Sequence, residues 1–371
     1  TRLQGDWSSD VCSSDLNMNI VKKIGLTALG TSLVASSAFA AELSVSGGAG
    51  YTYSSEDNTG SARGSEAIGY NHHISFSGST ELDNGWTVSS NMTIEPSLAL
   101  SSSHVKVVMG SMGTVAVGNG YGGIGANFDD ATPRAYEENH DGMTTSTAID
   151  NIGANLDNGQ VNYVSPSFDM GSGYSVTMHG EFAPTGNDVA VYDGGTAGAS
   201  NFGTGIGAAF VVTGNGLTAG AYVNEIESSR ITLQKTASTS TAFANYAIGS
   251  VTLGVQMANT DRGVIGAAEA ATTAKTVAAA TGEFETQKMS IAFAVNDDLS
   301  ISYGRLTETY DAQDNAATAI ADVEMESDSY QVAYSMGAMS ISAYHTSTDN
   351  PGWDSDATSQ ILMKSHLTLR S

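Results

Sequence analysis

The chain has 371 residues, a formal net charge of -25 and only 14 basic side chains. So acidic a chain is a poor partner for nucleic acid or anionic headgroups and a better one for cations. Its single cysteine, Cys12, lies in the first seventeen residues, so the rest of the chain has no disulfide, thiolate metal site or thiol nucleophile.

The first forty residues divide into two parts. Residues 1–17 are polar, show no periodicity and look like a leader that is not native to the protein. Residues 18–40 have the order of an export signal: a basic start, an apolar run too short to anchor in a membrane, and the small-residue pattern Ala38-Phe39-Ala40. We therefore expect cleavage after residue 40 and one domain over residues 41–371.

From residue 41 onward the sequence falls into short alternating segments. In the first, Leu43, Val45 and Tyr51 share one face, while small polar residues fill the other. Tight turns such as Asp83-Asn84-Gly85 join several pairs into hairpins. The alternation predicts sixteen strands: 42–53, 74–82, 86–95, 104–109, 114–118, 160–165, 174–182, 202–212, 217–227, 241–249, 251–260, 283–295, 299–310, 324–336, 338–346 and 358–370.

The connections between these segments are unequal. Short turns alternate with long polar stretches at 54–69, 183–201, 261–282 and 311–322, as in transmembrane barrels. A closed barrel pairs every backbone group in lipid without leaving an edge. We therefore predict an all-β chain that forms a transmembrane antiparallel up-and-down β-barrel of about sixteen strands. A secreted β-sandwich or solenoid is the alternative.

One long stretch interrupts the alternation. Asn119–Asn158 opens on a glycine-rich run and is too long for an ordinary connection. Its charged residues are Asp129, Asp130, Arg134, Glu137, Glu138 and Asp141. In a barrel, such a loop can fold inward and control what passes; a solvated surface loop is the alternative.

Several stretches together carry a resemblance to a known family. They are the signal end Ser36-Ser37-Ala38-Phe39-Ala40, the start Ala41-Glu42-Leu43-Ser44-Val45-Ser46-Gly47, the segment Ile74-Ser75-Phe76-Ser77-Gly78-Ser79-Thr80 and the run Val115-Ala116-Val117-Gly118-Asn119. Over nearly all of 41–348 the chain resembles the general porins of Gram-negative outer membranes, especially the alphaproteobacterial type. The resemblance implies a sixteen-stranded barrel, a homotrimer, passive diffusion of ions and small hydrophilic solutes, and a third loop that narrows the pore.

Carried onto this sequence, the resemblance makes 119–158 the pore constriction, with the six charged loop residues named above. It also implies a basic wall facing the loop, for which His104, Lys106 and Lys288 are the candidates. The resemblance implies a wall richer in arginine than this one. Because rings of carboxylates attract cations, we expect a cation-preferring channel.

Other candidate sites are weaker. His72 and His73 are adjacent in a strand and point to opposite faces, which disfavours a metal pair. The stretch 349–356 has clustered oxygens that suit calcium but lacks the EF-hand order, so a solvated loop is the preferred interpretation. No catalytic motif is present, and we predict a channel without enzymatic activity or cofactor.

A second function class stays open at this point. A secreted adhesin-like or surface-layer β protein has a similar composition, although the hairpins show no constant repeat. The C-terminus is also atypical, because the resemblance implies a terminal aromatic residue and this chain ends Leu369-Arg370-Ser371.

Overall fold

The structure, a computed structural model, describes residues 42–58, 65–95, 99–119, 124–141, 147–149, 152–153, 156, 158–186, 202–228, 236–261, 283–311, 322–355 and 359–370. The predicted leader (1–17) and export signal (18–40) lie outside these ranges, so both stay predictions.

Nearly all the regular structure in the described ranges is β-strand. The strands are β1 (Glu42–Asn58), β2 (Ser65–Glu81), β3 (Thr87–Ile94), β4 (Leu100–Val108), β5 (Thr114–Asn119), β6 (Asn158–Val164), β7 (Phe168–Gly171), β8 (Tyr174–Ala183), β9 (Phe202–Gly214), β10 (Leu217–Ser228), β11 (Ala237–Ile248), β12 (Val251–Asp261), β13 (Glu283–Ala294), β14 (Leu299–Asp311), β15 (Val323–Met336), β16 (Met339–Asp349) and β17 (Gln360–Arg370). No described helix is long and apolar enough to cross a membrane.

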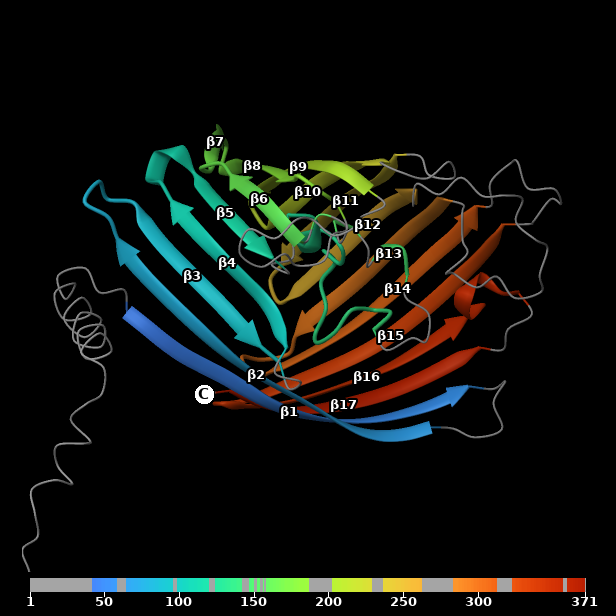
Figure 1. The fold of residues 1–371 in the computed structure, drawn as a ribbon. Helices are drawn as coiled ribbons and strands as arrows, with labels where there is room; N and C mark the ends of the chain where they lie inside the picture. Colours follow the sequence, from blue (N-terminus) through green and yellow to red (C-terminus); the bar gives the residue numbers. More distant parts are fainter. Residues whose placement is uncertain are drawn as a thin grey trace, which may run out of the picture.

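The strands form one closed cylinder (Figure 1). Neighbours along the barrel are neighbours in sequence and pair antiparallel, and the last strand returns to the first, with β1 paired to both β2 and β17. Closure gives the strands of the barrel wall a partner on each side, as the lipid environment requires, and only the short β7 pairs on one side among the described strands. The predicted up-and-down barrel is confirmed.

The seventeen strand segments make a sixteen-stranded barrel, because β6 and β7 are two parts of one strand. Both pair with β8: Val164 lies opposite His179, and Phe168 lies opposite Val176. Between them Pro166 has no N–H to donate to the ladder. Ser165 pairs with Met178 there: its N–H donates to the Met178 carbonyl (2.8 Å), and its hydroxyl accepts from the Met178 N–H (2.9 Å). The predicted count of sixteen holds.

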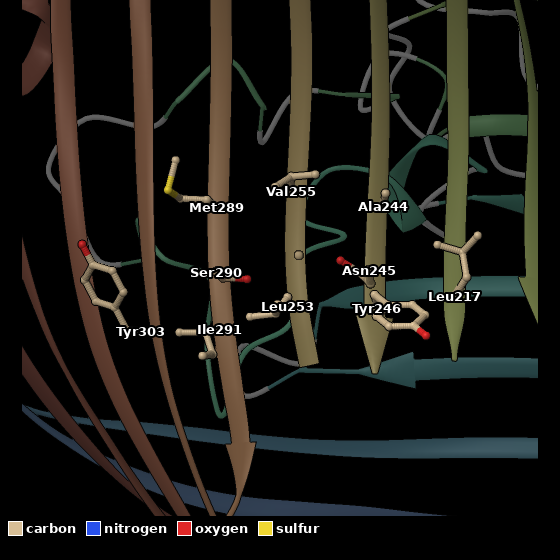
Figure 2. A pocket seen from close by; sticks show the side chains of 11 residues that line it. Leu217, Ala244, Asn245, Tyr246, Leu253, Val255, Met289, Ser290, Ile291 and Tyr303 are labelled. Atoms are coloured by element: carbon tan, nitrogen blue, oxygen red, sulfur yellow. The ribbon is translucent and has the colours of Figure 1, made fainter. Parts of the chain in front are cut away.

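The outer face of the barrel carries the apolar side chains. Leu43, Val45 and Ile68 are more than half exposed, as are Val255 and Met257 on the far side of the barrel. Figure 2 shows part of this face over β10 to β14, where an open hollow of about 470 Å³ lies among apolar side chains such as Leu253 and Met289. In a bilayer, such a belt contacts lipid.

The strands extend further than the apolar pattern does. The stretch 54–69, predicted as a long loop, is mostly strand: the β1–β2 ladder continues to the pair Glu56 and Ser65. The prediction was wrong here because Ser54 and Ser55 are paired in the sheet but lie beyond the apolar belt, so hydrophobic alternation does not mark the strand end.

Candidate functional site

The described part of the loop between β5 and β6 (124–141, 147–149, 152–153 and 156) lies inside the barrel; we call it the inner loop (Figure 1). It begins against β8, where the Ile124 N–H donates to the Glu181 carboxylate (2.8 Å). It reaches β17, where the Tyr136 hydroxyl contacts His366 Nδ1 (2.5 Å). Because its contacts run from β8 to β17, the inner face of β2 to β5 lies across the lumen from it. The predicted inward fold of this segment is confirmed.

Two glutamine side chains on the wall bind the loop backbone. Gln256 accepts a hydrogen bond from the Ala131 N–H (3.0 Å) and donates to the Phe128 carbonyl (2.6 Å). Gln331 accepts from the Tyr136 N–H (3.0 Å) and donates to the Glu137 carbonyl (2.6 Å). Each side-chain amide thus satisfies one N–H and one carbonyl of the loop backbone. The irregular backbone of the loop needs such partners because it forms no helix or sheet hydrogen bonds there.

Apolar contacts hold the ends of the inner loop. Ile124 and Phe128 pack with Ile149 and Ile152 against Tyr222 of β10, whose ring stacks on Phe128 with centroids 5.6 Å apart. Farther along, Ala148 joins a cluster of inward-facing side chains on β13 to β15 and at Trp353. The sequence contains a signal for this docking that the strand pattern alone did not reveal. Large apolar residues occupy inward positions of strands whose inward positions are otherwise polar: Tyr222, Phe284, Leu306 and Met325.

Asp130 and Lys288 form a buried ion pair at the centre of the loop. Lys288 Nζ lies 2.7 Å from Asp130 Oδ2, and their side chains are 0% and 1% exposed. Arg134 approaches the same carboxylate at 3.5 Å. Burial alone would raise the pKa of Asp130, but the two cations hold it below its ordinary value. Lys288 therefore lies beneath the loop, which differs from the expectation that it faces the loop across the lumen.

The remaining loop acids are closer to the lumen. Burial raises the pKa of Asp129 to about 6. The hydrogen bond that its carboxylate accepts from the Asp130 N–H (2.6 Å) acts in the opposite direction and lowers this pKa. Glu138 lies 3.9 Å from Arg134, and both side chains are about one-third exposed. Asp141 accepts hydrogen bonds from the Tyr344 hydroxyl (2.8 Å) and Lys364 Nζ (3.2 Å).

The wall across from the loop carries the other two predicted residues. His104 and Lys106 are on β4, and both point inward because Val105 between them is exposed on the outer face. Their cross-strand neighbours Asn91 and Ser89 share that inner face. The predicted wall positions thus lie far apart: His104 and Lys106 face the lumen, whereas Lys288 is covered.

Residues that sequence reasoning missed include Glu181, Lys364 and His366, which contact the loop from β8 and β17. No group of three or more histidine or acidic side chains that could hold a metal ion occurs among the described residues. The calcium prediction involves Asp356, which lies outside the described residues, and stays a prediction.

A closed barrel with a loop docked on its inner wall defines a channel-type membrane protein. Residues 25–322 match the family model described as Gram-negative porin. The chain therefore belongs to the Gram-negative porin family, and it is an outer-membrane porin channel. The adhesin-like or surface-layer alternative has no support in this fold or in this match.

Solved structures with the same fold share little sequence with this chain. A porin refined at 1.8 Å resolution has a TM-score of 0.59 and 13% identity, covering 89% of this chain and all of its own. An OmpF of Salmonella typhi, solved with daunomycin, has a TM-score of 0.62 and 14% identity, covering 90% of this chain and 98% of its own. OmpT of Vibrio cholerae in a trimer form has a TM-score of 0.53 and 12% identity, covering 89% of this chain and 99% of its own. No curated protein sequence matches the chain.

Proposed function

We propose that this porin passes ions and small hydrophilic solutes by passive diffusion with a preference for cations, without a cofactor and without enzymatic activity. The observation that supports the preference is the charge balance of the inner loop. Its described residues include five carboxylates and only one arginine. The two wall lysines that reach it, Lys288 and Lys364, are engaged with Asp130 and Asp141. The field along the loop is therefore negative, which favours cations in the lumen.

The test is the reversal potential of single channels in a planar bilayer under a salt gradient. We expect the triple variant D129N/E137Q/E138Q to lose most of the cation preference while remaining folded, because Asp130 and its buried pair are left intact. A matched control, E225Q/E283Q/E285Q, removes three carboxylates from exposed positions on the outer face of β10 and β13. Equal reversal potentials for the loop variant and the control would show that the loop does not set selectivity.

We also propose that the protein is exported through residues 18–40 and works as a homotrimer in the outer membrane. The family match supports the location. The assembly is supported by OmpT of Vibrio cholerae, which has the same fold and a solved trimer form. Light scattering of the refolded protein in detergent, corrected for bound detergent, is expected to give three times the chain mass. A monomer mass with full channel conductance would contradict the trimer.

A further inference from the structure

Two histidines on the inner wall lie on either side of a glycine pair in β1. Tyr51 and Tyr53 of β1 are exposed on the outer face, so Gly48 and Gly50 are successive inward positions. A Cβ on Gly48 would lie 2.7 Å from the His73 ring, and one on Gly50 would meet the His366 ring. The two imidazoles therefore lie over the glycines, one from β2 and one from β17.

His366 lies where the inner loop meets the wall. The Tyr136 hydroxyl of the loop contacts His366 Nδ1, and the two ring centroids lie 5.8 Å apart. Lys364, two residues before His366 on β17, pairs with Asp141 of the loop. His73 is exposed on β2, on the other side of β1 from β17. The two histidines thus lie where the loop contacts end and the open wall begins.

The charged and titratable groups around the pair come from the inner loop and from the neighbouring strands. The loop contributes Tyr136 and Glu137, and Asp141 pairs with Lys364 of β17. From β16, Tyr344 lies near Tyr136, with ring centroids 6.1 Å apart.

His73 has a different set of neighbours. The inward positions next to it on β2, Asn71 and Ser75, carry no charge. Glu95, one position beyond the pair of Ile74 and Ile94 on β2 and β3, lies level with His73. Each histidine therefore has a carboxylate nearby, His366 from the loop and His73 from the end of β3.

We propose that His73 and His366 are specificity-determining residues of this channel: protonated, they place positive charge on the wall beside the acidic loop and lower the preference for cations. This inference rests on the proposed cation-preferring function. Histidine is the side chain whose ordinary charge change falls between about pH 5 and 8. The two histidines then add more positive charge to the wall in acidic than in alkaline medium, so the selectivity of the pore depends on pH.

The experiment must separate His73 and His366 from Asp129, whose pKa of about 6 lies in the same range, and from His104, which also faces the lumen. All channels therefore carry D129N/H104Q, and the permeability ratio of cation to anion is measured between about pH 8 and pH 5. In this parent channel we expect the ratio to fall about twofold or more on acidification. H73Q/H366Q should abolish most of the fall.

The control removes two histidines that point the other way. They are His72 on β2 and His345 on β16. His72 is two residues from Tyr70, and His345 is four residues from Ile341; because Tyr70 and Ile341 are exposed on the outer face, both histidines point outward as well. H72Q/H345Q should therefore follow the parent curve. If H73Q/H366Q follows the parent curve as well, the inference is overturned.

A second variant keeps the inference testable if loss of the His366 contact prevents folding. H73R alone should give a fixed positive charge on the open wall and lower the cation preference at the alkaline end as well. A conducting H73R channel with parent selectivity would overturn the inference. Failure of the proposed function is a different result, since the unsubstituted channel would then show no cation preference at any pH.

Discussion

At the scale of single residues, the site depends on one buried ion pair. Asp130 and Lys288 are both removed from solvent and lie 2.7 Å apart, with Thr132 donating a further hydrogen bond to the carboxylate (2.9 Å). A buried carboxylate is tolerated only while its partners remain, because desolvation of a lone charge costs several kcal/mol. The pair therefore fixes the middle of the inner loop to β13 rather than contributing charge to the lumen.

We expect K288M to destabilise the folded protein by about 3 kcal/mol, since breaking a buried pair leaves one charge uncompensated. The double variant K288M/D130N should recover most of that loss. Urea-induced unfolding in lipid vesicles measures both. Lys106 provides the matched control because no ion pair involves it among the described residues, and K106M should change stability by less than about 0.5 kcal/mol. Equal effects of K288M and K106M would show that the ion pair does not stabilise the loop.

At the scale of elements, the contrast between strands and loop explains what the sequence could predict. Alternation at period two identifies which residues of a strand share a face, and Leu43, Val45 and Met257 lie on the outer face accordingly. Loss of alternation after residue 119 predicted the loop. Its inward fold was a hypothesis from its length in a predicted barrel, and the family resemblance implied the same. Strand ends were not predictable from hydrophobicity. β1 continues as a hydrogen-bonded strand through the polar Ser54 and Ser55, and in β2 the polar His72 interrupts the outward apolar residues, so the part before it was missed.

Periodicity also cannot show what covers an inward side chain. Lys288 and Lys106 have the same phase in their strands, yet one is buried beneath the loop and the other faces the lumen. The distinguishing signal lies in neighbouring strands, where Tyr222 and Leu306 place apolar surface on the inner face. Large apolar residues on the polar phase of a predicted barrel strand indicate where an inner loop docks.

At the scale of the whole molecule, the barrel and the inner loop have different roles. The closed ladder satisfies the backbone in lipid, and the outer belt holds the barrel there. The inner loop, bound by Gln256, Gln331 and Glu308 from three strands, presents acidic side chains along one side of the lumen. Selectivity is then a property of the open wall and the loop together, which is why the wall histidines matter.

The measurement that tests this account most directly is the conductance of the chain from residue 41, refolded in detergent and added to a planar bilayer under a salt gradient. We predict stepwise conductance increments with a reversal potential that shows cation preference. A folded, heat-modifiable β-protein that inserts into the bilayer but gives no conductance, or gives an anion-selective reversal potential, would contradict the account.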